Sequence, residues 1–280
     1  MFSPYYAWSR RRHAGLADPL DHCAINVALY RLGGATTGAN RWAMTERRRH
    51  AVNRSATHLQ IGPSAIYWAG GDLCVDINEI TVPWPSRLRG RVRLTPHAVQ
   101  GGCYALDAKA MHHWQPIAPI ARVEVEMQHP GLCWQGPAYL DSNRGDAPLE
   151  AHFDRWHWSR ASLADGRCAV LYDVQARGAA PPLSLAFAFN AQGHAEAFKP
   201  PPLQALPGTG WGIARETRCD AGGTAVVKQT LENAPFYARS LLSTQLGGEP
   251  ATAVHESLSL ARFEALPVQA MLPFRMPRAG

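Results

Sequence analysis

Apolar and polar side chains alternate with a period of two along several stretches of the chain. In Arg87–Leu94, arginine fills every other position, and leucine, glycine or valine fills the positions between. Arg122–Met127 alternates valine and methionine with charged residues, and Leu183–Phe189 alternates leucine and phenylalanine with serine and alanine. Successive side chains of a strand point to opposite faces, so this pattern predicts strands with one buried face.

Further strands and turns are indicated elsewhere. The apolar run Cys23–Tyr30 predicts a strand, and Phe236–Gln245 and Ala253–Phe263, on either side of Gly247 and Gly248, predict a hairpin. The proline-rich stretch Lys199–Gly208 is predicted to be a loop or stiff linker. Because short strands and turns prevail, the chain is predicted to be an all-β barrel or sandwich.

Composition agrees with this fold class and suggests a ligand. The chain has 280 residues, of which 46% are hydrophobic, with 24 Gly, 22 Pro and 9 Trp. This suits an all-β protein with many turns, and an apolar barrel interior is a natural container for an elongated hydrophobic ligand. Strand faces change from basic to acidic near Ile120, which predicts two antiparallel halves, 1–119 and 120–280.

Charge and cysteine usage limit the partners and the compartment. The net charge of +6 is concentrated in Ser9–His13 (SRRRH) and Glu46–His50 (ERRRH), which are typical of solvated faces and also of surfaces that meet an anionic membrane. No motif for nucleic-acid binding accompanies them, so no nucleic acid is expected as a partner. The six cysteines form no CxxC, and no signal peptide or membrane-spanning run is evident, so a cytoplasmic, peripherally membrane-associated protein is expected.

Histidine, serine and glycine patterns exclude several kinds of site. His112 and His113 are adjacent and would point to opposite faces of a strand, and His152 and His157 have no second cluster at ligand spacing. No metal site is therefore predicted. Ser159 lacks a GxSxG elbow, and no GxGxxG or P-loop is present, so no nucleotide cofactor is predicted.

The stretch YLDSNRGD (Tyr139–Asp146) carries the most suggestive chemistry. Its composition is typical of a turn, and both aspartates are favoured in turns and caps. Tyr139 and Asp141 are two apart on an extended segment and would share one face. If that face is apolar and lined by indoles, burial raises the pKa of Asp141 and makes it a neutral proton donor.

Two alternatives for this stretch stay open at this level. Asp141 and Asp146 are turn residues only, or they form a carboxylate pair of a glycosidase with tryptophan platforms for sugars. The indoles in question, which are candidates for substrate binding, are Trp134, Trp156 and Trp158.

Blocks along essentially the whole chain resemble one family. They include FSPYYAWSRRR (Phe2–Arg12), DHCAINVALY (Asp21–Tyr30), PSRLRGRVRL (Pro85–Leu94), HHWQPIAPIARVEVE (His112–Glu126) and WQGPAYLDSNRGDAPLEAHFDRWHWSRA (Trp134–Ala161). These blocks are similar to those of the carotenoid 1,2-hydratases, also called hydroxyneurosporene synthases. The resemblance implies two lipocalin-like β domains and a hydro-lyase of carotenoid-producing phototrophic bacteria that needs no redox cofactor and works beside the membrane.

The resemblance also implies a reaction and its residues. Water adds across the terminal C1–C2 double bond of acyclic carotenes such as neurosporene and lycopene, through protonation at C2 and a tertiary cation at C1. The catalytic acid of the family matches Asp141, and the cation-stabilising aromatic residues match Tyr139 and Trp114. Asn143, Asp21 and His22 are candidates, by polarity alone, for deprotonating the water, and Asp141 or bulk water is the alternative.

Two further expectations complete this picture. A non-catalytic lipocalin-like carotenoid carrier is the alternative function, which would leave Asp141 without a purpose. Family members carry a strand region ahead of FSPYYAW, so the first half is expected to lack its N-terminal strand, or the sequence is expected to start late at Met1.

Overall fold

The computed structural model describes residues 3–13, 16–32 and 40–279, which form two compact units. Unit 1 comprises the chain up to Pro96, Ala121–Ala138 and the segment from Gln269 onward, and unit 2 comprises His97–Ile120 and Tyr139–Val268. The long strands β9 (His112–His129) and β10 (Leu132–Gly145) each contribute to both units. The predicted division into the contiguous halves 1–119 and 120–280 stays a prediction, as does a missing first strand.

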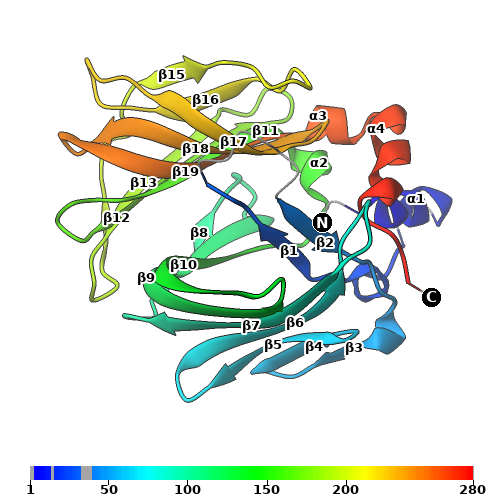
Figure 1. Cartoon of the computed structure of the whole chain (residues 1–280). Helices are drawn as coiled ribbons and strands as arrows, with labels where there is room; N and C mark the ends of the chain where they lie inside the picture. The colour runs from blue at the N-terminus through cyan, green and yellow to red at the C-terminus, as the bar shows by residue number, and fades with distance from the viewer. Residues whose placement is uncertain (1–2, 14–15, 33–39, 280) are drawn as a thin grey trace. The chain divides into compact units, whose positions relative to one another are not determined.

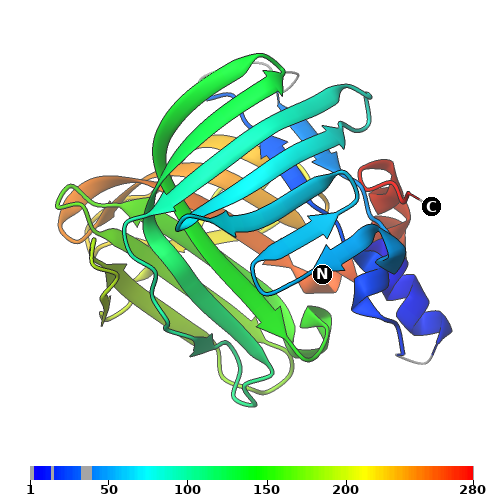
Figure 2. The ribbon, with the colours of Figure 1, turned by 90° about the horizontal axis from the view of Figure 1, so that it is seen from below.

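Unit 1 is built on antiparallel strands that follow one another in sequence order. The order is β9-β7-β6-β5-β4-β3, with β10 beside β9, and the blue and cyan strands of this sheet lie side by side in Figure 2. A separate pair, β1 and β2, shares with this sheet a core that includes Val27, Ala43, Ile77, Leu88 and Val125. The strands are β1 (Asn26–Leu29), β2 (Arg41–Met44), β3 (Val52–Arg54), β4 (His58–Ile61), β5 (Ser64–Ala69), β6 (Asp72–Ile80) and β7 (Arg87–Pro96).

The ends of the described chain meet inside unit 1. Helix α1 (Pro4–Arg12) begins at Ser3, whose hydroxyl caps the Tyr6 amide, and Pro4 occupies the first turn. Near the C-terminus, Arg278 donates to Asp21 and forms an ion pair with the buried carboxylate of Glu46 at 3.1 Å. Within the described residues, the remaining helices are η1 (Pro19–His22), η3 (Arg49–Ala51), α2 (Leu149–His152), α3 (Leu260–Phe263), α4 (Leu266–Met271) and η4 (Leu272–Phe274).

Unit 2 is built on a seven-stranded antiparallel sheet. Its order is β14-β13-β12-β11-β19-β18-β17, and the pair β15-β16 lies over it (Figure 1). The short strand β8 pairs with the start of β9. The strands are β8 (Tyr104–Ala105), β11 (Phe153–Ser162), β12 (Cys168–Ala176), β13 (Leu183–Phe189), β14 (Ala195–Ala197), β15 (Leu203–Leu206), β16 (Arg215–Arg218), β17 (Val226–Asn233), β18 (Tyr237–Leu246) and β19 (Glu249–Ser259).

The two faces of the seven-stranded sheet differ in what covers them. On one face, Leu171, Ala186 and Leu242 share a hydrophobic core with Leu206 of β15. The alternate residues therefore point to the other face, among them Trp158 and Tyr172, which are register partners on β11 and β12. This second face, which we call the aromatic face, meets the segments of β9 and β10 that belong to unit 2.

Most predicted strands are confirmed, and three segments differ. The expected loop Lys199–Gly208 contains β15, because Leu203–Leu206 pairs with β16. The second hairpin strand ends at Ser259, where the serine hydroxyl caps α3. YLDSNRG is not a turn, since Tyr139–Gly145 completes β10. Within the described residues, every helix falls short of the length and apolar character needed to cross a membrane.

Candidate active site

Asp141 of β10 receives two hydrogen bonds on one oxygen. The indole Nε1 of Trp114 donates to Oδ2 over 2.8 Å, and the hydroxyl of Tyr139 donates to the same Oδ2 over 3.0 Å. Tyr139 and Asp141 are two apart on the strand and share a face, as predicted from their spacing, while Trp114 is fully buried on β9. When Asp141 is neutral, Oδ2 is the carbonyl-type acceptor of both bonds, so the proton lies on Oδ1.

The surroundings of Asp141 favour the neutral acid. Burial raises the pKa of its carboxyl above the usual range, against the hydrogen bonds from Trp114 and Tyr139, and the negative charge of Glu256 acts in the same direction as burial. Burial likewise raises the pKa of the Tyr139 hydroxyl well above its ordinary value, so the phenol stays a donor. The same two donors stabilise the carboxylate once the proton leaves.

Aromatic rings surround this acid. The ring of Trp158 lies 5.4 Å from that of Tyr139, and the ring of Trp114 lies 5.8 Å from that of Tyr172. Trp156 faces Tyr172 at 6.1 Å, so both indoles of the WHW stretch belong to the aromatic face. Further rings within 6.4 Å of Trp114 are those of Tyr104, Phe187 and Phe189.

Tyr139 has a cation beside its ring. The guanidinium carbon of Arg160 lies 5.5 Å from the ring centroid, and Arg160 comes two residues after Trp158 on β11. The ring of Tyr139 is therefore already engaged by a protein cation, and its hydroxyl is engaged with Asp141. This geometry favours Tyr139 as a hydrogen-bond donor to Asp141 over Tyr139 as a ring that stabilises a cation of the substrate.

Other predicted residues lie apart from Asp141. The exposed Asn143 is two residues further along β10, and the Tyr172 hydroxyl approaches its Oδ1 at 3.4 Å. The exposed Asp146 lies beyond the end of β10, where its amide donates to the carbonyl of Met111. Asp146 thus lies outside the strand that carries Asp141, which disfavours a glycosidase pair of these two aspartates.

Three predicted residues belong to unit 1, whereas the Asp141 cluster lies wholly in unit 2. Trp134 is 42% exposed. Asp21 accepts from Arg278 over 2.8 Å, and the buried His22 contacts Glu46 over 2.9 Å. Asp21 and His22 are thus parts of the ionic cluster that joins the two ends of unit 1.

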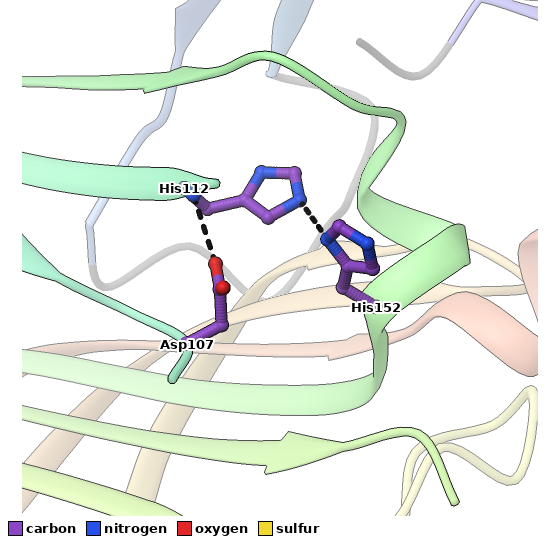
Figure 3. A group of neighbouring side chains, drawn as sticks. All are labelled: Asp107, His112 and His152. Carbon is purple, nitrogen blue, oxygen red and sulfur yellow. Dashed lines mark hydrogen bonds between the residues drawn. The ribbon is translucent and has the colours of Figure 1, made fainter. Parts of the chain in front are cut away.

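A group of titratable side chains that the sequence patterns did not connect lies at the start of β9. His112 Nε2 lies 3.0 Å from His152 Nδ1. The two rings face each other beside Asp107 (Figure 3). Two imidazoles and a carboxylate are a plausible metal-ligand set. The two rings bond to each other, and Asp107 accepts from the amides of Lys109, Met111 and His112. The buried Nδ1 of His112 has no hydrogen-bond partner among the described residues.

A cavity of about 760 Å³ belongs to unit 1 and has a polar, charged lining. Arg89, Arg91, Asp76 and Glu126 contribute to its wall, and Arg91 is ion-paired with Asp76. No residue of the Asp141 cluster lines it, and charged walls suit an apolar ligand poorly. The chemistry described above therefore does not depend on this cavity.

Sequence reasoning from the residues reached Asp141 and Tyr139 but missed the rings around Trp114. Tyr172 ends the buried, mostly apolar run Cys168–Tyr172 of β12, and its register opposite Trp158 reveals its direction. Phe187 and Phe189 were placed together on one strand face by their alternation, and they do share the aromatic face. Tyr104 lies on a two-residue strand that no periodicity could predict.

Curated relatives resemble this chain over its whole length. The acyclic carotenoid 1,2-hydratase of Thiocapsa roseopersicina is 56% identical, over 100% of this chain and 67% of the relative. The enzymes of that name from Rubrivivax gelatinosus and Rhodobacter capsulatus are 47% and 41% identical, over 99% of this chain in both cases and over 67% and 95% of the relatives.

Solved structures support the fold alone. A candidate AttH protein from Nitrosomonas europaea superimposes with a TM-score of 0.56 at 15% identity, over 79% of this chain and 77% of that one. Kievitone hydratase from Nectria haematococca gives 0.51 at 11% identity, over 82% and 78%. These neighbours confirm the predicted all-β, lipocalin-like fold class.

The family itself is identified over the full length of the sequence. The model of the family described as carotenoid hydratase CrtC matches residues 1–280. The resemblance drawn from the sequence blocks is thereby confirmed. The chain belongs to the CrtC family of carotenoid hydratases, which are hydro-lyases.

Proposed function

We propose that this protein hydrates the terminal C1–C2 double bond of acyclic carotenes such as neurosporene and lycopene, with Asp141 as the general acid. The observation that supports this most is the convergence of Trp114 and Tyr139 on Oδ2 of Asp141. A buried carboxyl with a raised pKa keeps its proton to a higher pH than an exposed carboxyl does, and the two neutral donors stabilise the carboxylate when the proton is lost.

The reaction follows from this arrangement. The proton on Oδ1 passes to C2 of the alkene, and the positive charge forms at C1, where two methyl groups make the cation tertiary. Electron-rich ring faces stabilise such a charge, and the half-buried indole of Trp158 and the buried indole of Trp114 supply them beside the acid. Water then adds to C1 and gives the tertiary alcohol.

Tyr139 and Trp114 have a role in this scheme beyond cation stabilisation. Each donates to Oδ2, which shares the negative charge once Oδ1 has lost its proton, so each lowers the free energy of the carboxylate more than that of the acid. Trp114 presents both its N–H to Asp141 and its ring to the neighbouring aromatic residues. Tyr139 acts mainly through its hydroxyl, since Arg160 lies against its ring.

The test is incubation with lycopene in water labelled with oxygen-18. Label in a tertiary hydroxyl of the product is expected with the wild type, and a loss of about 10²- to 10⁴-fold in rate is expected for Asp141→Asn. Binding of lycopene without any labelled product would support the carrier hypothesis instead. Product formation by Asp141→Asn at the wild-type rate would refute the role of the acid.

Contact with an anionic membrane is the second part of the proposal, because the substrate dissolves in lipid. Exposed arginines of α1, Arg11 and Arg12, lie near the 37% exposed indole of Trp8 in the same helix. The second basic run contributes less than expected, since Arg47 is buried against Glu79. Retention on anionic vesicles at low salt, and its loss in Arg11→Ala/Arg12→Ala, is expected in a flotation assay. Equal retention of that variant would contradict it.

A further inference from the structure

Glu256 lies beside the acid-bearing cluster on the aromatic face. It is the register partner of Trp158 on the adjacent strand, so their side chains point to the same face with Cβ atoms about 5 Å apart. Trp158 packs on Tyr139, and Tyr139 donates to Asp141. One indole and one phenol therefore separate two carboxyl groups that are 115 positions apart in the sequence.

Arg239 forms an ion pair with Glu256. Its Nε donates to Oε1 of Glu256 over 3.0 Å, and Arg239 is in turn the register partner of Glu256 on β18. The same Nε lies 3.0 Å from the hydroxyl of Tyr237. The carboxylate is thus fixed by a neighbour on its own sheet rather than by the substrate.

The two carboxyl groups have opposite surroundings. Asp141 meets two neutral donors and aromatic rings, whereas Glu256 meets a guanidinium and keeps 21% of its side chain exposed to water. The charge of Glu256 is also one of the causes that raise the pKa of Asp141. Two carboxyl groups whose environments differ in this way are typical of an acid and base pair.

We propose that Glu256 is the general base that takes a proton from the attacking water, with Arg239 as the residue that positions it. This rests on the proposed hydration by Asp141. Asp141 gives its proton to C2, the oxygen of water forms a bond to C1, and one hydrogen of that water passes to Oε2 or Oε1 of Glu256. The net change is addition of H and OH, and exchange with solvent returns the proton from Glu256 to Asp141.

The experiment separates formation of the cation from its capture by water. In D₂O, Asp141 delivers deuterium to C2, and a cation that is not captured returns a proton, which leaves deuterium in recovered lycopene. The readout is the ratio of this exchange to hydration, measured by mass spectrometry. Loss of the base is expected to slow capture while protonation continues.

Glu256→Gln is expected to lose about 10²- to 10³-fold in hydration and to keep the exchange. The ratio of exchange to hydration should therefore rise by a similar factor. Hydration at the wild-type rate, or a loss of both reactions in a variant that circular dichroism shows to be folded, would overturn the base assignment. If the glutamine variant does not fold, Glu256→Asp, which keeps the charge, must show a raised ratio, and an unchanged ratio overturns the proposal.

Two reference variants make the result specific. Asp173 forms a comparable ion pair with Arg218, at 16% side-chain exposure, on the opposite face of the sheet. Asp173→Asn is expected to leave the ratio of exchange to hydration unchanged. A rise of this ratio as large as that in Glu256→Gln would show that loss of any buried ion pair in the sheet has the same effect, and it would overturn the proposal. Asp141→Asn must lose exchange and hydration together, and persistence of the exchange in that variant would refute the proposed function rather than the role of Glu256.

Discussion

The two faces of the seven-stranded sheet both carry buried titratable groups, but in different surroundings. The aromatic face presents Trp158 and Tyr172 toward Asp141, and Glu256 lies beside them. The opposite face carries His157 and His255, whose rings stack 6.1 Å apart within the interior of unit 2. Adjacent residues of one strand, His157 and Trp158, therefore belong to different chemical environments.

The histidine face shows that buried polar neighbours alone do not make a reactive site. His157 Nδ1 lies 2.9 Å from the Ser257 hydroxyl, and His157 Nε2 lies 3.8 Å from Glu216. Serine, histidine and a carboxylate thus follow one another as they do in a catalytic triad. Ser257 is nevertheless 0% exposed, so no substrate can meet its hydroxyl. The half-buried Asp141, in contrast, combines a perturbed acid with partial access.

Among variants that keep both carboxyl groups, the largest effect is expected from removing the donors to Asp141. Trp114→Phe and Tyr139→Phe each delete a hydrogen bond to a developing carboxylate, worth about 1.5–3 kcal/mol, so each should lower the hydration rate about 10- to 100-fold. Both bonds favour the charged form, so their loss raises the pKa of Asp141 further. Since the acid must be protonated, the descending limb of the pH–rate profile should move to higher pH.

The matched control for this pair is Trp156→Phe, which alters an indole on the same face. Trp156 contacts Tyr172 and Phe153, whereas the side-chain donors to Asp141 are Trp114 and Tyr139. Its pH–rate profile should keep the wild-type limb. A shift equal to that of Trp114→Phe would show that the profile reports general packing of the aromatic face.

A second effect concerns the space around the strand that carries Asp141. A Cβ added at Gly145 would lie 2.2 Å from Nδ1 of His112, whose side chain is fully buried. Gly145→Ala should therefore cost about 1–3 kcal/mol of folding free energy, measured by denaturant unfolding. Gly136→Ala on the same strand meets nothing within 4 Å and should be nearly neutral, so equal losses would refute this explanation.

The sequence predicts the strands of this protein better than it predicts their junctions. Alternation identified β7 and β13. One face of each strand is more buried than the other, so apolar residues recur at every second position. It could not identify β15, since the stretch is rich in proline and its pairing with β16 is non-local. The composition of YLDSNRG favours a turn, and only its pairing in the sheet keeps it extended.

For the candidate site, too, local spacing was predictable from the sequence and contacts between distant segments were not. The spacing of Tyr139 and Asp141 placed both on one face, and the structure adds what spacing cannot give, namely that the phenol donates to the acid. Asp107, His112 and His152 come together only because β9 and the segment after β10 meet in three dimensions. Trp114 was reached through the family resemblance, since a buried indole on a strand is usually part of a core.

The histidine face should control acid stability instead of activity. Burial lowers the pKa of His255 to about 4 and that of His157 to about 3, from an ordinary value near 6.5. A lowered pKa gives stability that is present above pH 6.5 and is lost as the pH falls toward 4, because only the unfolded chain takes up the proton. His255→Gln should therefore reduce the loss in folding free energy between pH 8 and pH 5 by about 2 kcal/mol.

Thermal unfolding at the two pH values measures this difference. The control is His194→Gln, because His194 is exposed and should leave the pH dependence unchanged. Hydration activity of His255→Gln at pH 8 should stay within a few-fold of the wild type. A loss of activity as large as that of Trp114→Phe would mean that the two faces are not functionally separate.

The smallest effect tests whether the aromatic face carries its acid at a cost in stability. Because the folded-state pKa of Asp141 is raised, its contribution is full below the ordinary value near 3.9 and is lost as the pH rises through the raised value. Asp141→Asn has no charge to bury, so its Tm should exceed that of the wild type by about 1–4 °C at pH 8 and by less at pH 4. Asp146→Asn changes an exposed carboxyl and should show no such gain in Tm. A lower Tm for Asp141→Asn than for the wild type at pH 8 would mean that the Asp141 carboxylate stabilises the folded protein, contrary to this prediction.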